Sequence, residues 1–115
     1  MPVTTDGLSR IFAALADPTR RDILSRLETG PLSVTELAAP YSMSRPAVSQ
    51  HVTVLEEAGL ITRSAAAQYR PCHLRPEGMD EASAWIAQHS AAWERRFEKL
   101  DQHLRRTAPD EERNA

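Results

Sequence analysis

The chain contains very few of the residues on which disulfide frameworks and phosphate-binding loops depend. Its 115 residues include one cysteine, Cys72, and four glycines. A single cysteine excludes an intrachain disulfide framework and fits a reducing, cytoplasmic compartment. The sequence has no glycine-rich phosphate loop, and no Ser/His/Asp or Cys/His arrangement with a supporting motif. These absences argue against an enzyme.

Long apolar runs are also missing. No stretch approaches the ~20 consecutive apolar residues that a membrane-spanning helix needs, and the N-terminus lacks the apolar region of a signal peptide. We therefore expect a protein that does not associate with membranes. The Ala- and Leu-rich segments predict one mostly α domain over residues 1–106, followed by a disordered tail at 107–115.

Acidic residues are absent from two particular stretches, although the net charge of the chain is −2. Residues 37–55 contain one arginine and no acid, and residues 58–76 contain three arginines and no acid. Local basic surfaces, more than the overall charge, attract a protein to a polyanion. This placement of charge favours nucleic acid as a partner.

Residues 33–60 have the pattern of a helix, a tight turn and a second helix. Ser33 and Glu36 have the spacing of a capping box, which predicts the start of the first helix. Pro40 cannot continue that helix, so residues 41–43 form the turn. Ser44 can cap the second helix, because Pro46 is tolerated in its first turn.

The second helix is apolar on one side only. At about 100° per residue, Val48, Val52 and Leu55 lie on one narrow stripe, and Gln50 lies opposite them. An ordinary solvated helix is usually rich in Glu and Lys, which are missing here until Glu56. We therefore predict a DNA-reading helix. The alternative is a plain helical pair with a solvated outer face.

The other predicted elements surround this helix-turn-helix. Residues 8–15 have helical spacing, and Asp17-Pro18 is a strong start for a helix that Gly30-Pro31 ends. Gly59 closes the DNA-reading helix. Residues 60–63 and 69–74 are predicted strands of a two-stranded wing, and residues 77–106 are a predicted long helix.

That long helix carries an apolar stripe spaced three and four residues apart over about seven turns, as in a coiled coil. The rest of a short chain has little core with which to cover it. We therefore predict a homodimer that pairs these stripes, although packing of the stripe on the chain's own first helix is the alternative. The residues assigned to dimerisation are Leu8, Ile11, Phe12, Ile86, His89, Trp93, Phe97, Leu100 and Leu104.

The chain resembles the ArsR (arsenic-repressor) family of bacterial regulators over about residues 8–104. The matching segments are Leu15-Ala16-Asp17-Pro18-Thr19-Arg20-Arg21, Ile23-Leu24, Leu27, Ser33-Val34-Thr35-Glu36-Leu37-Ala38, Ser44-Arg45-Pro46-Ala47-Val48-Ser49-Gln50-His51 and Leu55-Glu56-Glu57-Ala58-Gly59-Leu60-Ile61. The resemblance implies a mostly α, winged helix-turn-helix fold with a two-stranded wing and a long C-terminal dimerisation helix. It also implies a homodimeric regulator of transcription, usually a repressor, that binds double-stranded DNA at an inverted repeat.

Carried over residue by residue, the resemblance makes Ser44, Arg45, Pro46, Ser49 and Gln50 the candidates for reading bases. Independently of the resemblance, Arg63 and Arg70 of the predicted wing would hold the phosphate backbone. His51 lies toward the core side of the helix, where buttressing the helix and contacting a phosphate are both open. The complete set of DNA-binding candidates is Ser44, Arg45, Pro46, Ser49, Gln50, His51, Thr53, Arg63 and Arg70.

The metal-binding patterns of the family are incomplete in this chain. Some members carry a Cys-x-Cys pair in the first helix of the helix-turn-helix, where this chain has Leu37-Ala38-Ala39. Others carry Asp-x-His followed eleven residues later by His-x-x-Glu, of which the chain has only Asp101-x-His103. We expect no metal site and no cofactor, and the sequence identifies no effector.

Other residues with possible chemistry have plain structural interpretations. Cys72 has no second cysteine to resolve an oxidised form, so an inert thiol is favoured over a redox sensor. His89 is favoured as a hydrogen-bonded side chain over a pH-sensing group in a dimer seam. Trp85 and Trp93 are favoured as packing residues over the lining of a ligand pocket. A helical protein-interaction module remains the alternative function, but it would not explain the acid-free stretch at 37–55.

Overall fold

A computed structural model describes residues 6–65 and 69–107 of the chain. The chain forms two compact units, residues 1–82 and 83–115, which are described separately. The predicted tail, apart from Thr107, lies outside the described residues. Within the part that is described, no helix combines the length and apolar character needed to cross a membrane.

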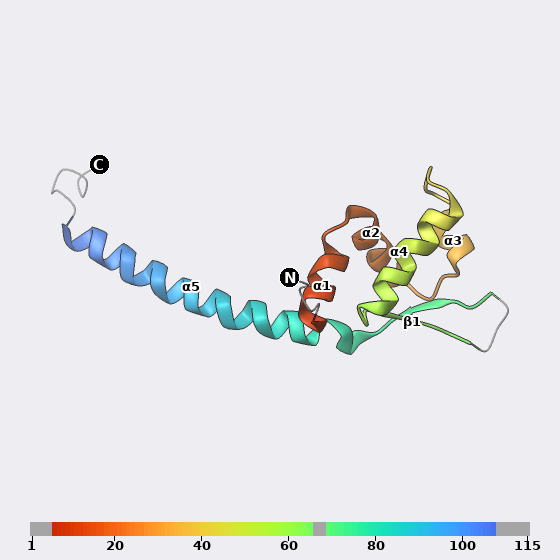
Figure 1. Cartoon of the computed structure of the whole chain (residues 1–115). Helices are drawn as coiled ribbons and strands as arrows, with labels where there is room; N and C mark the ends of the chain where they lie inside the picture. The colour runs from red at the N-terminus through yellow and green to blue at the C-terminus, as the bar shows by residue number, and fades with distance from the viewer. Residues whose placement is uncertain (1–5, 66–68, 108–115) are drawn as a thin grey trace, which may run out of the picture. The chain divides into compact units, whose positions relative to one another are not determined.

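The first unit begins with two helices whose starts are set by aspartate caps (Figure 1). Helix α1 spans Gly7–Leu15, and the Asp6 side chain accepts a hydrogen bond from the Ser9 amide at 2.7 Å. Helix α2 spans Pro18–Leu27, and the Asp17 side chain accepts from the Arg20 amide at 3.0 Å. The predicted cap at Asp17, followed by proline, is therefore confirmed.

Helices α3 (Val34–Ala38) and α4 (Arg45–Glu57) pack side by side as the helix-turn-helix (Figure 1). Both hydrogen bonds of the capping box are present: the Glu36 amide donates to Ser33 Oγ at 3.1 Å, and the Ser33 amide donates to Glu36 Oε1 at 3.0 Å. The Ser44 hydroxyl accepts from the Ala47 amide at 3.3 Å. These caps satisfy backbone amides that have no partner within the helix, so the local sequence determines where each helix begins.

The wing consists of strands β1 (Ile61–Arg63) and β2 (Cys72–Leu74), which pair antiparallel with Arg63 opposite Cys72. Both strands are shorter than predicted. Arg70 has a positive φ of 41°, outside the extended region, and Pro71 has no amide to donate to a ladder. An unpredicted bridge joins the other edge of β2, where the Cys72 amide donates to the Leu32 carbonyl at 2.7 Å.

The core of the first unit lies where α1, α2, α3, α4 and the wing meet. Side chains of every one of these elements are buried in it: Ile11, Ala14, Ile23, Leu27, Leu37, Val48, Val52, Leu55, Leu60, Ile61, Cys72 and Ala82. The predicted apolar stripe of α4 is fully buried. Burial on this side leaves the opposite side of α4 to the solvent.

The predicted long helix begins three residues later than expected. A 3-10 turn, η1, occupies Pro76–Met79, and α5 then spans Asp80–Thr107. The turn forms because Gly78 donates its amide to the Arg75 carbonyl at 2.9 Å and lies directly against the backbone of Gly59. Gly59 itself has a φ of +78°, as expected for the residue that ends α4.

Taken by itself, the second unit is one helical segment with a largely exposed apolar stripe. Phe97 is 71% exposed and Trp93 60%, and Ile86, Leu100 and Leu104 are also exposed. Ile11, which the sequence assigned to dimerisation, is by contrast a core residue that is only 4% exposed. That assignment was wrong, because α1 turns Ile11 into the core of its own subunit.

Candidate nucleic-acid interface

The outward side of α4 presents polar side chains that no core contact occupies. Ser44, Arg45, Pro46 and Gln50 are exposed, and Ser49 is half-buried. Because Val48, Val52 and Leu55 hold the other side of the helix in the core, the exposed groups are displayed on a fixed support. Arginine and glutamine are suited to this position, since both can form paired hydrogen bonds with base edges.

A hollow of about 310 Å³ lies beside α4, between the start of α3 and the wing. Among the residues that the structure describes, Arg45, Arg63 and Arg70 line this hollow and no aspartate or glutamate does. The remaining lining residues are polar or small: Ser33, Val34, Thr35, Ser49 and Tyr69. A concave surface with several arginines and no acid is suited to a phosphate group. The structure thus brings together residues that are separated by 25 positions in the sequence.

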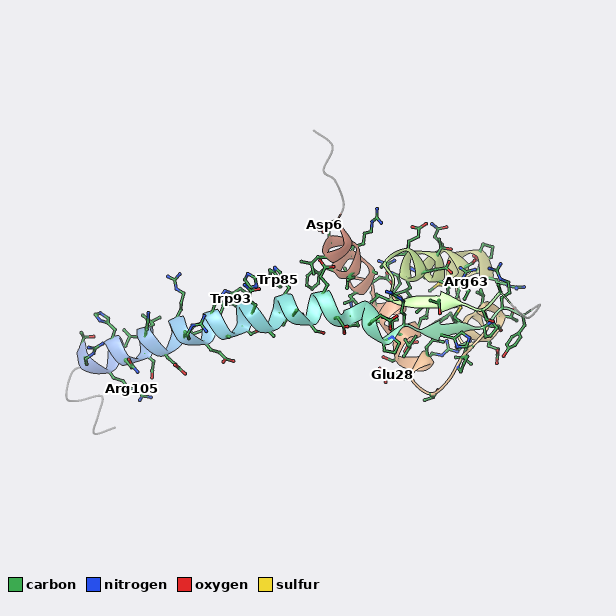
Figure 2. The ribbon with its side chains drawn as sticks, turned by 90° about the horizontal axis from the view of Figure 1, so that it is seen from below. Asp6, Glu28, Arg63, Trp85, Trp93 and Arg105 are labelled. Atoms are coloured by element: carbon green, nitrogen blue, oxygen red, sulfur yellow. The ribbon has the colours of Figure 1, made fainter. Side chains whose placement is uncertain are left out.

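Arg63 is held within the unit more firmly than the sequence suggested. Its Nη2 donates to Thr53 Oγ1 at 3.2 Å, and its Nε lies 3.6 Å from Glu56 Oε1. The side chain is only 17% exposed, and Figure 2 shows it between β1 and α4. The Thr53 hydroxyl also donates to the Ser49 carbonyl at 3.0 Å. Arg63 and Thr53 therefore join the wing to α4, a role that could not be identified from the sequence.

Arg70, unlike Arg63, has an exposed side chain. Its backbone has a φ of +41°, which non-glycine residues rarely adopt. Such conformations cost free energy and tend to persist where function requires them. The residue also lines the hollow beside α4.

The turn of the helix-turn-helix is fastened to α2 by two charged residues that the sequence analysis did not identify. Arg26 donates to the carbonyls of Leu37 and Glu36, at 2.8 and 3.1 Å, and its guanidinium lies 5.4 Å from the centre of the Tyr41 ring. The Tyr41 hydroxyl donates to the Asp22 carboxylate. Burial, followed by this hydrogen bond to Asp22, raises the pKa of Tyr41 above its usual value.

The His51 side chain lies on the side of α4 that faces α2. Its Nδ1 lies 3.1 Å from Arg20 Nη1 and 3.9 Å from Asp17 Oδ2. The structure therefore places His51 apart from the arginine-lined hollow, on the side of α4 that faces α2.

Comparison with known proteins places this geometry in a family. A family described as "Helix-turn-helix domain" matches residues 15–64. The arsenical resistance operon repressor of Escherichia coli is 32% identical over 101 residues, which cover 86% of this chain and 83% of that protein. A crystal structure of an ArsR family transcriptional regulator is 40% identical, with a TM-score of 0.72 over 77% of this chain and 98% of that one. The chain belongs to the ArsR family of transcriptional regulators.

A further relative is similar to part of this ArsR-family chain. The HTH-type transcriptional regulator Rv2034 of Mycobacterium tuberculosis is 50% identical over 70 residues, or 61% of this chain. The aligned region spans 65% of the length of Rv2034. The expected fold, a mostly α winged helix-turn-helix, is thus confirmed by the structure and by the relatives together.

Cys72 lies in β2, at the centre of the small sheet of this ArsR-family chain. Its side chain is fully buried. Burial raises the pKa of the Cys72 thiol, and this effect outweighs the nearby Arg63 guanidinium, which lowers it. A buried thiol with a raised pKa is a poor nucleophile. Within the described residues, no group of three or more His, Cys, Asp or Glu side chains is arranged to hold a metal ion.

In the second unit, the Trp85 ring stacks on the His89 ring with centroids 4.1 Å apart, and His89 Nδ1 lies 2.9 Å from the Trp85 carbonyl. Figure 2 shows Trp85 and Trp93 along α5. Trp93 lines an open apolar groove with Arg96, Phe97 and Leu100. Trp93, Phe97 and Leu100 are three of the residues predicted from the sequence to form the dimer interface.

Proposed function

We propose that the chain is a homodimeric repressor of transcription that binds an inverted-repeat operator in double-stranded DNA. The observation that carries this proposal is the exposed polar side of α4 beside a hollow whose described lining residues include Arg45, Arg63 and Arg70 and no aspartate or glutamate. The names of relatives support the repressor role: SdpR of Bacillus subtilis, 28% identical over 79 residues, is a transcriptional repressor.

In this proposal α4 enters the major groove, and its exposed side chains contact different parts of the DNA. Arg45 contacts a phosphate or a guanine edge, and Gln50 reads an adenine or a thymine-bearing pair. Ser44, Pro46 and Ser49 lie on the same side and complete the base-reading surface. Arg63 and Arg70 provide positive charge for the phosphate that fits the hollow.

The apolar stripe of α5 supports the homodimer. The exposed members Ile86, Trp93, Phe97, Leu100 and Leu104 repeat at coiled-coil spacing. Such a continuous exposed stripe is typical of a surface that another helix covers. A two-fold pair of subunits places two α4 helices in successive major grooves, roughly 34 Å apart.

Genomic footprinting followed by fluorescence anisotropy tests the function. Fragments recovered from the genome of the source organism should share an inverted repeat. The protein should bind that repeat at least about a thousandfold more tightly than a scrambled duplex of the same composition. Equal affinity for the two duplexes would refute specific recognition.

A further inference from the structure

Arg20, in the first turn of α2, joins three helices of the first unit through one guanidinium group. Its Nε donates to the Ala14 carbonyl at 2.8 Å and its Nη2 to the Ala13 carbonyl at 2.9 Å, both at the C-terminal end of α1. Its Nη1 lies 3.1 Å from His51 Nδ1 on α4. Each guanidinium nitrogen thus has a partner on another helix.

The contact between Arg20 and His51 has a direction. A guanidinium group has only donors, so His51 Nδ1 is the acceptor in this contact. The charged groups that face the imidazole are Arg20 and Asp17, both from α2, while α1 contributes only the carbonyls that orient Arg20.

An arginine also holds α4 on its other flank, where Arg63 of β1 donates to Thr53. His51 and Thr53 are two residues apart, so they lie about 200° apart around the helix axis. The buried Val48, Val52 and Leu55 hold α4 against the core. The two hydrogen bonds add directional contacts on either flank of the helix, where they can fix how far α4 is rotated about its own axis.

We infer that Arg20 and His51 are positioning residues for DNA recognition. The hydrogen bond from Arg20 to His51 sets the rotation of α4 and therefore the orientation of Gln50, the adjacent residue. Neither Arg20 nor His51 needs to contact DNA. The inference rests on the proposed function, because it concerns the aim of a DNA-reading helix.

Two substitutions of His51 distinguish its role as a hydrogen-bond acceptor from the volume that its side chain fills. In His51→Asn the amide oxygen stands close to the position of Nδ1 and can still accept from Arg20, whereas His51→Leu fills a similar volume without an acceptor. We expect His51→Leu to lose about tenfold in affinity for the selected repeat, the usual effect of one such bond. We expect His51→Asn to stay within about threefold of the wild type. Equal affinities for all three proteins would overturn the inference.

Arg21 provides the matched control for Arg20. Its Nη1 donates to the Leu15 carbonyl at 2.7 Å, so it also binds the end of α1, and this bond does not involve His51. Arg20→Gln should lower operator affinity about tenfold, whereas Arg21→Gln should leave it nearly unchanged. Equal losses in the two variants would show that fastening α1, and not the contact with His51, is what matters.

Nitrogen NMR of the protein without DNA tests the contact independently of the proposed function. The His51 Nδ1 signal should be that of an unprotonated, hydrogen-bonded nitrogen, and this preference should disappear in Arg20→Gln. A proton on Nδ1 in the neutral wild type would overturn the inference even if the protein recognises its operator. Failure of the wild type to discriminate operator from scrambled DNA would instead refute the proposed function.

Discussion

Gly78 lies directly against the backbone of Gly59, so that a Cβ atom built on Gly78 would come within 2.2 Å of the Gly59 carbonyl oxygen. The neighbouring atoms are backbone, which cannot rotate away as a flexible side chain can. This contact fixes the 3-10 turn η1, between the wing and α5, against the end of α4.

Gly78→Ala should therefore destabilise the first unit by about 1–3 kcal/mol, because the backbone of η1 or of Gly59 must shift to admit a methyl group. Urea unfolding followed by circular dichroism measures the change. Gly7→Ala is the control, since a Cβ there would meet Glu81 Oε2 at 3.4 Å, an ordinary contact. It should be neutral or more stable by up to about 1 kcal/mol. Equal stability of Gly78→Ala and wild type would contradict the close approach.

The exposed position of Gln50 opposite the buried stripe of α4 predicts a direct role in base recognition. Gln50→Ala should cost about 1–3 kcal/mol in binding to the selected repeat, with little change in stability. Selection from randomised duplexes should also show relaxed preference at one position in each half-site. Gln102→Ala, an exposed substitution on α5, should change neither quantity. An unchanged base preference in Gln50→Ala would remove Gln50 from the reading surface.

Arg70 should contribute to affinity through charge alone. Arg70→Asn removes the guanidinium group while retaining a residue that tolerates the left-handed backbone at this position. Binding to operator and scrambled duplexes should weaken by the same factor, and the slope of log affinity against log salt should fall in magnitude by about one. Titrations at several salt concentrations provide the slope. Arg10→Gln, at an exposed site on α1, serves as the control and should leave the slope unchanged. A selective loss of operator binding in Arg70→Asn would indicate base contact instead.

The apolar stripe of α5 should be required for specific binding. Leu100→Asp introduces a charge that would be buried without a partner in a dimer, at a cost on the order of several kcal/mol. We expect a monomer in sedimentation velocity and loss of tight operator binding, although every residue on α4 is intact. Gln102→Asp, two residues away on the opposite side of the helix, should remain dimeric. A dimeric Leu100→Asp with full affinity would place the interface elsewhere.

Some of this structure could be predicted from short stretches of sequence because its causes are local. The caps at Asp17, Ser33 and Ser44 each depend on residues within three positions, and the spacing of Val48, Val52 and Leu55 alone identifies the buried side of α4. These features rest on helix geometry and on the hydrogen bonds of helix ends.

Other features depend on residues brought together by packing, which periodicity does not encode. The Leu32–Cys72 bridge and the contact between Arg20 and His51 join positions 40 and 31 residues apart. For the same reason Arg63 could be recognised as a basic residue of the wing, but not as a partner of Thr53. Ile11 was misassigned because helical spacing identifies an apolar side without saying what covers it.

Sedimentation equilibrium of the protein with a duplex carrying the selected inverted repeat shows whether two subunits act together on one operator. We expect a complex of two chains with one duplex, formed much more tightly than the complex with a single half-site, because the second half-site adds at high effective concentration. A complex containing one 12.8 kDa chain, with equal affinity for the full repeat and the half-site, would contradict this expectation.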